Sequence, residues 1–202
     1  MDVRYPGFCT TEELWNIRRD NMKRFVDKFL PLINIKPTDK CFDIGEYNPK
    51  IKYLSEKLNI KVCQIEKIDF NFDEINENAN VIFCLEVLEH LQNPLLFMNR
   101  LKQCLSFGGR IYITIPVNQR WLWCDGHYFE IPRKHFEKWI LEPLDLKTTK
   151  YKRINFIHDW RGFFIGFRPL VKLLKGELTI KDLIRKVAYY KYDFYEIKKK
   201  NI

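Results

Sequence analysis

Residues 86–91 (EVLEHL) place two carboxylates and an imidazole directly after a short apolar run, residues 81–84. That run is too short for a helix and is bounded by polar residues, which predicts a buried strand. In open α/β sheets, ligands bind just outside the carboxyl ends of parallel strands. The position of Glu86, Glu89 and His90 therefore predicts a binding site. An imidazole can accept a proton at neutral pH, so His90 is either a general base or a residue that orders the loop.

A second polar and aromatic segment covers residues 121–130 (WLWCDGHYFE). Aromatic side chains stack on flat ligands and exclude water. His127 could remove a proton from a hydroxyl group of a bound ligand, and a neighbouring carboxylate could orient the imidazole. The candidate ligand-binding residues are Trp121, Trp123, Asp125 and Glu130. The alternative is a tryptophan-rich lid that packs on the core, with a structural His127.

The strands and helices that would position these residues are predicted from the spacing of apolar residues and from the glycines and prolines that interrupt it. Residues 81–84, an amphipathic stretch over 93–105 and an apolar run over 110–115 predict strand, helix and strand, with Gly108-Gly109 ending the helix. This order is typical of a βαβ crossover. Further helices are predicted over residues 11–32, 49–58, 132–141, 168–174 and 179–190, strands over 40–45 and 61–66, and two edge strands within 146–157.

The series of residues 86–91, Asn93-Pro94, Gly108-Gly109 and Ile115-Pro116 resembles a class I S-adenosylmethionine-dependent methyltransferase. The resemblance is strongest to the group that includes ubiquinone, methionine-pathway and glycan-associated methyltransferases, and it covers roughly residues 38–150. It implies a doubly wound, mostly parallel, seven-stranded-type α/β sheet and S-adenosylmethionine as the cofactor. It also implies methyl transfer, which we expect to reach an oxygen of a small-molecule or glycan-like acceptor.

The resemblance also implies roles for single residues. Glu66, at the end of the second strand, would accept hydrogen bonds from the cofactor ribose, and Asp69 would contact the adenine amine. The other implied cofactor-binding residues are Asp43, Gly45, Glu46, Leu85 and Glu86. Later glycines of the family's turn are replaced here by Tyr47, Asn48 and Pro49. This departure leaves open a non-catalytic relative that binds or activates a partner protein.

The length of the chain indicates how many domains it has, and its charge bears on which kinds of substrate it can bind. The 202 residues fit one domain, which we divide into an N-terminal helical cap (1–37), a methyltransferase core (38–157) and an aromatic, basic, helical extension (158–202). The net charge of +9 is spread along the chain, and no Asn-Pro-Pro-Tyr-like motif is present, which argues against the third alternative, a nucleic-acid methyltransferase. Lys198-Lys199-Lys200 could give weak contact with a membrane surface.

Targeting and cysteine patterns add two expectations. The sequence contains no apolar run of eighteen residues and no apolar signal core near Met1, so we expect a cytoplasmic protein. Its six cysteines include no C-x-x-C pair, which favours small buried core residues over disulfides or a metal site.

Overall fold

The computed structural model describes residues 12–45, 49–65, 69–70, 73, 75, 77–117, 128, 131–156, 176 and 190–200. The helices are α1 (Glu12–Phe29), α2 (Pro49–Leu58), α3 (Pro94–Cys104) and α4 (Arg133–His135), with α4 continuing through a π-helical segment (Phe136–Leu141) and a 3₁₀ turn (Glu142–Leu144). Two further 3₁₀ turns are Leu30–Leu32 and η2 (Leu88–His90). The strands are β1 (Cys41–Ile44), β2 (Val62–Ile65), β3 (Ala79–Leu85), β4 (Leu105–Val117), β5 (Leu146–Phe156) and β6 (Tyr190–Lys199).

The strands of the described residues form one six-stranded sheet in the order β2-β1-β3-β4-β6-β5. The first four run parallel, and β6 lies antiparallel between β4 and β5. The carboxyl ends of β1, β2, β3 and β4 therefore meet at one edge, as the predicted doubly wound α/β fold requires.

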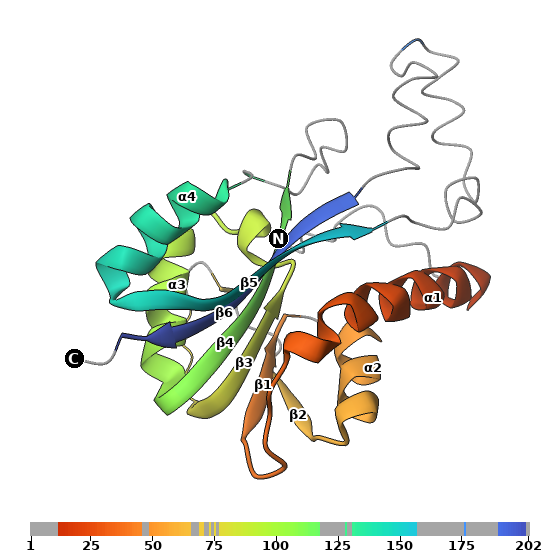
Figure 1. Ribbon diagram of the computed structural model, residues 1–202, viewed down its shortest axis with the longest axis horizontal. Coiled ribbons are helices and arrows are strands. Elements are labelled where there is room, and N and C mark those ends of the chain that lie inside the picture. Colours follow the sequence, from red (N-terminus) through yellow and green to blue (C-terminus); the bar gives the residue numbers. More distant parts are fainter. Residues whose placement is uncertain are drawn as a thin grey trace.

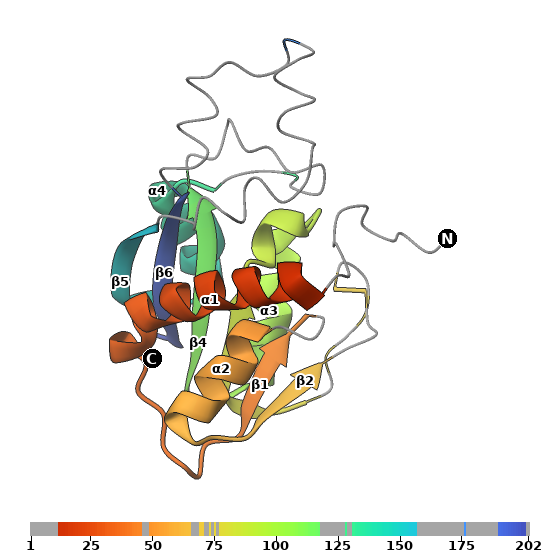
Figure 2. The same ribbon diagram turned by 90° about the vertical axis from the view of Figure 1, so that its right-hand side faces the viewer.

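Helices cover both faces of the sheet (Figures 1 and 2). α1 and α2 lie on one face, and α3 lies with the α4 segment on the other. The alternation of side chains along β6 explains how one strand serves both layers. Phe194 stacks on Phe29 of α1 with a centroid distance of 5.2 Å, whereas the adjacent Tyr195 packs 5.0 Å from Phe136 on the opposite face.

Proline and N-cap residues determine where α2 and α3 begin, at the positions that the sequence predicted. Pro49 opens α2, where its missing N–H costs no hydrogen bond. Asn93 caps α3, because its Oδ1 accepts a 3.0 Å hydrogen bond from the backbone N–H of Leu96. Pro94 then occupies the first turn of α3. These three positions fix where two of the site-bearing connections enter their helices.

Three expectations were wrong. α3 ends at Cys104 and β4 begins at once, so the two glycines lie inside the strand rather than at the end of the helix. A Cβ on Gly109 would lie 2.9 Å from the carbonyl oxygen of Asn80, so close approach of β3 explains the glycine. Residues 146–156 form one edge strand rather than two, because β5 pairs along its whole length with β6.

The third error concerns the end of the chain. Residues 190–199 form β6, whereas the sequence interpretation ended a helix at Tyr190 and left the final charged residues frayed. Aromatic and apolar residues alternate there with polar ones, and β4 and β5 pair with both edges of the strand. The rest of the predicted helical extension lies outside the described residues except for Gly176.

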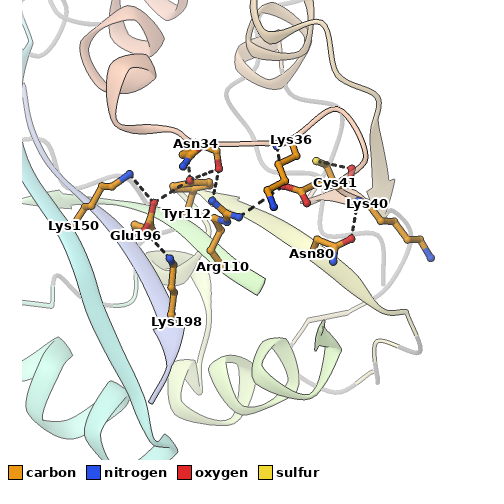
Figure 3. Close-up of polar contacts among 11 residues, drawn as sticks. Asn34, Lys36, Lys40, Cys41, Asn80, Arg110, Tyr112, Lys150, Glu196 and Lys198 are labelled. Carbon is orange, nitrogen blue, oxygen red and sulfur yellow. Dashed lines mark hydrogen bonds and ion pairs between the residues drawn. The ribbon is translucent and has the colours of Figure 1, made fainter. Parts of the chain in front are cut away.

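A buried carboxylate holds β6 in register with β4 (Figure 3). Glu196, which is 2% exposed, accepts a 3.0 Å hydrogen bond from the hydroxyl of Tyr112 and lies 3.0 Å from the ammonium of Lys150. The backbone N–H of Asn34 donates to the Tyr112 hydroxyl, which links the chain entering β1 to the same network. Part of the basic charge thus neutralises a buried acid. No helix of the described segments is long and apolar enough to cross a membrane.

Candidate active site

The sheet register brings three polar residues towards the edge predicted to bind a ligand. Asp43 of β1 pairs with Phe83 of β3, and Leu85 at the end of β3 pairs with Thr114 of β4. The backbone N–H of Glu86 then donates a 3.1 Å hydrogen bond to the carbonyl oxygen of Thr114. These pairings align the chain after β1 with the chain after β3.

Buried polar atoms without partners gather in this region. Asp43 and Glu89 are each 1% exposed, and Thr114 is fully buried. Within the described residues, both carboxyl oxygens of Asp43, Oε2 of Glu89 and Oγ1 of Thr114 have no hydrogen-bond partner. Folded proteins satisfy nearly all such groups, so several together indicate a place where a ligand supplies the missing donors.

Burial controls the protonation of the two acids. It raises the pKa of Asp43 well above its usual value, whereas the charge of Lys50, the backbone N–H of Ile44 and the side chain of Gln64 act to lower it. It also raises the pKa of Glu89 to about 8, and the negative charge of Glu86 adds to that shift. Burial is again the main cause of the raised pKa of the Cys84 thiol, with Glu89 and Asp43 contributing through their charges. The two acids therefore share one electrostatic environment around Cys84.

Lys50 brings a positive charge to this region. It is the second residue of α2, and its Nζ lies 2.5 Å from Oε2 of Glu86. The Lys50 side chain is 11% exposed and that of Glu86 is 27% exposed. Phe25 of α1 presents its ring 5.4 Å from the same ammonium. Lys50 therefore links α1, α2 and the end of β3 at the edge where the unpartnered acids lie.

Gly45 forms the turn that leaves β1. Its φ of +123° belongs to a backbone region that side chains other than glycine rarely adopt. A Cβ at this position would meet only Cγ2 of Val87, at 3.9 Å. Conformation rather than crowding therefore demands glycine, as expected where the backbone must turn sharply beside a ligand.

The structure describes six of the predicted site residues. Asp43, Gly45, Leu85 and Glu86 lie at the ends of β1 and β3, and His90 ends η2 with partial exposure. Asp69 lies in the turn region after β2, where its backbone N–H donates to Oδ2 of Asp73. The other predicted site residues lie outside the described part of the chain: Glu46, Glu66, Trp121, Trp123, Asp125, His127 and Glu130.

The sequence interpretation missed two residues of this region, Lys50 and Thr114. Thr114 is a small hydroxyl residue in the apolar run of β4, which could have been recognised as a polar group within a buried strand. Lys50 gave no such signal, because a lysine one residue after a helix-opening proline usually faces solvent. Glu89, which the sequence placed with Glu86 and His90 in the predicted binding site, is buried.

Solved structures of low sequence identity share this fold. A phosphoethanolamine N-methyltransferase from Haemonchus contortus, in complex with S-adenosylhomocysteine, is 12% identical with a TM-score of 0.61, over 90% of this chain and 53% of that one. The O-MT segment of StiE is 12% identical with a TM-score of 0.56, over 89% and 74%. The [4+2]-cyclase SpnF is 12% identical with a TM-score of 0.58, over 88% and 81%.

These neighbours differ in the reactions that their names give, so the likeness establishes the fold and leaves the acceptor open. A search of curated protein sequences finds no match. The model of a methyltransferase domain, by contrast, matches residues 14–162, which span α1 to β5 and include both strand-end segments of the site. The chain therefore belongs to the methyltransferase-domain family, and it shares the fold of solved S-adenosylmethionine-dependent methyltransferases, as the resemblance at residues 86–116 predicted.

Proposed function

We propose that this protein binds S-adenosylmethionine at the carboxyl ends of β1, β2 and β3 and transfers its methyl group to an oxygen of a small-molecule or glycan-like acceptor. The observation that carries the proposal is the buried carboxyl of Asp43, which stands two positions before Gly45 and whose oxygens form no hydrogen bond of good geometry with the described residues, although Ile44 and Gln64 lie near enough to lower its pKa. A cofactor with ammonium and hydroxyl donors would satisfy such a carboxyl. The positive φ of Gly45 lets the backbone turn beside it.

The remaining cofactor contacts are assigned by position. Leu85 and Glu86 lie at the end of β3, next to β1 with Asp43, and are assigned to the methionine part together with Glu46, the residue after Gly45 in the sequence. Glu66 continues the chain from β2 and would accept from the ribose hydroxyls, because a carboxylate offers two acceptor oxygens side by side. Asp69, a few residues on, is assigned to the adenine amine.

The protein's part in the reaction would be to position the acceptor and remove one proton. S-adenosylmethionine supplies an electrophilic methyl group, so no protein nucleophile is needed. His127 would take the proton that the acceptor hydroxyl loses when its oxygen is methylated. Asp125 or Glu130 would orient the imidazole, while Trp121 and Trp123 would stack on the acceptor and exclude water.

One described contact supports this assignment of the tryptophan-rich segment. Tyr128 is the described member of residues 121–130, and its backbone N–H donates to the carbonyl oxygen of Glu89 in η2. His127 is its immediate neighbour in the chain. Since η2 follows the strand end that carries Glu86, the contact ties the segment to the edge of the sheet where the cofactor is assigned.

Calorimetric titration with S-adenosylhomocysteine tests the proposal. We expect binding by the wild-type protein and an affinity at least tenfold lower for Asp43→Asn, because the amide replaces one of the two acceptor oxygens that the cofactor's donors would use. Asp20→Asn, which alters an exposed acid on α1, is the matched control and should bind like the wild type. Equal affinity for Asp43→Asn and the wild type would remove Asp43 from the site.

A second candidate is a non-catalytic relative that binds or activates a partner protein. The Lys50–Glu86 ion pair favours it, because in that case the pair fills the place of the cofactor's methionine part. The same titration separates the two candidates: a wild-type protein that does not bind S-adenosylhomocysteine is the non-catalytic one.

A further inference from the structure

In the ion pair of Lys50 and Glu86, each residue has a position or backbone conformation that is locally unfavourable in free energy. A cation in the first turn of a helix opposes the positive end of the helix dipole. Glu86 has a φ of +59°, a left-handed conformation that costs free energy for a residue other than glycine. Nζ of Lys50 nevertheless lies 2.5 Å from Oε2 of Glu86. Backbone strain and an opposed dipole at one contact indicate a functional requirement.

Stability is a weak explanation for the pair. Both side chains are largely removed from water, and the desolvation of two charges offsets most of their attraction. Neither residue extends the apolar core on either face of the sheet. Lys50 is instead held from the α1 side by the ring of Phe25, 5.4 Å from its ammonium. The contacts with Phe25 and Glu86 therefore fix the position of the Lys50 ammonium and add little to the stability of the fold.

The surroundings of Lys50 are acidic. Its charge acts on the buried carboxyls of Asp43 and Glu89, lowering the pKa of each against the dominant effect of burial. Among the described residues, the ammonium of Lys50 thus interacts with three carboxyls, those of Asp43, Glu86 and Glu89. A ligand that brings one cationic and one anionic group would let Lys50 bind the anion while an acid next to it binds the cation.

The start of α2 also lacks a donor that it would otherwise offer. Pro49 opens the helix and has no N–H, and Lys50 follows it. Helix N-termini bind anions through their free N–H groups, so this terminus is poorer for that purpose than one without proline. The Lys50 ammonium supplies the missing positive group at the same place.

We propose that Lys50 binds the α-carboxylate of the cofactor's methionine part and that Glu86 binds its α-ammonium. The inference rests on the proposed binding of S-adenosylmethionine. The Lys50–Glu86 contact opens as the ligand enters, and each side chain exchanges its partner for the complementary end of the amino acid. No bond other than hydrogen bonds and ion contacts changes. Lys50 thereby makes the site selective for nucleosides that carry an intact amino acid.

Two ligands separate this role from general binding. S-adenosylhomocysteine carries the amino acid, whereas 5′-methylthioadenosine keeps the adenosine and the thioether but lacks it. We expect calorimetry to show that Lys50→Met weakens S-adenosylhomocysteine binding by about 10–100-fold and changes 5′-methylthioadenosine binding less than about threefold. Lys50→Gln, with an uncharged polar side chain, should show the same selective loss.

Lys52→Met is the matched control, because it removes an exposed lysine from the same helix. Its affinities for both ligands should equal those of the wild type, and circular dichroism should show that all variants are folded. Equal weakening of both ligands in the Lys50 variants, or no weakening of either, overturns the inference and leaves the proposed function standing. A wild-type protein that binds neither ligand overturns both.

Discussion

The backbone N–H of Tyr128 donates a 2.8 Å hydrogen bond to the carbonyl oxygen of Glu89. This bond joins the tryptophan-rich segment, residues 121–130, to the short helix η2, whose own start follows the carboxyl end of β3. The Tyr128 side chain is 55% exposed, so the backbone rather than packing of the ring makes the link. A segment attached in this way can respond to ligands bound at the edge of the sheet.

We predict that acceptor binding changes the fluorescence of this segment. An acceptor would first be chosen from a panel of hydroxylated sugars and phenols. The chosen compound is the one that makes the protein convert S-adenosylmethionine to S-adenosylhomocysteine. Titrating it should quench or shift tryptophan emission more than the cofactor alone does. The double variant Trp121→Phe/Trp123→Phe should lose the change, whereas Trp139→Phe, which alters a tryptophan that is 62% exposed beside His135, should keep it. An unchanged response in the double variant would contradict the assignment.

His127 should matter to turnover and not to cofactor affinity. If it takes the acceptor proton, His127→Ala lowers turnover by about 10²–10⁴-fold while calorimetry gives the wild-type affinity for S-adenosylhomocysteine. His90 is the contrasting variant, since it ends η2 beside the proposed cofactor site, and His90→Ala should weaken S-adenosylhomocysteine binding. Near-normal turnover in His127→Ala would remove the base assignment.

Glu66 should contribute to cofactor affinity through the ribose. Glu66→Ala is expected to weaken binding of S-adenosylhomocysteine by about 1–3 kcal/mol, the cost of leaving polar groups without their acceptor. 5′-Methylthioadenosine keeps the ribose and should weaken by the same factor, unlike its response to Lys50→Met. Unchanged affinity for both ligands would place the ribose elsewhere.

Local patterns were sufficient to predict much of the fold. The βαβ unit followed from an apolar run, an amphipathic stretch and the Asn93-Pro94 start, all within residues 81–115. The bounds of α2 followed from Pro49 and the apolar period, and agree with the structure. Each of these signals acts between neighbours in the chain, where a single sequence is informative.

Long-range pairing was not readable in the same way. Residues 190–199 form β6, which pairs with β4 along one edge and with β5 along the other. The sequence of these ten residues alone does not indicate which two strands they pair with. The same holds for the site. Asp43 and Glu86 were predicted from the rule that ligands bind at strand ends, whereas the Lys50–Glu86 contact needs a positive φ at Glu86 and the convergence of α1 and α2.

The buried acid Glu89 predicts how stability depends on pH. Its folded-state pKa of about 8 lies above the ordinary value of 4.5, so between these pH values the folded state holds a proton that the unfolded state releases. The stability of the ligand-free protein should therefore fall as pH rises through this window, with a contribution from Glu89 of up to about 1.4 kcal/mol per pH unit. Urea unfolding at pH 5, 6, 7 and 8 measures it.

Glu89→Gln removes the titrating group and should flatten that dependence, so that the variant gains stability over the wild type as pH rises. Glu142→Gln, at an exposed position in the 3₁₀ turn after α4, should leave the wild-type slope in place. Parallel curves for Glu89→Gln and the wild type would show that Glu89 does not hold a proton in the folded protein.

The ion pair between Arg153 and Asp193 should stabilise the pairing of β5 with β6 more than the partial exposure of Arg153 suggests. Asp193 is fully buried and accepts hydrogen bonds of 2.7 and 2.9 Å from Arg153, with a further 2.9 Å bond from the Tyr151 hydroxyl. Arg153→Met leaves this carboxylate without its cation, and we expect a loss of about 1–3 kcal/mol in the free energy of unfolding at pH 7.

Arg133 offers a closely matched control for that prediction. Its side chain is 43% exposed, as is that of Arg153, and it also contacts Tyr151, but its acidic partner Glu137 is 31% exposed rather than buried. Arg133→Met should therefore cost no more than about 1 kcal/mol, because water can solvate the carboxylate left behind. Urea unfolding of both variants measures the difference, and equal losses would show that burial of the partner does not set the strength of the pair.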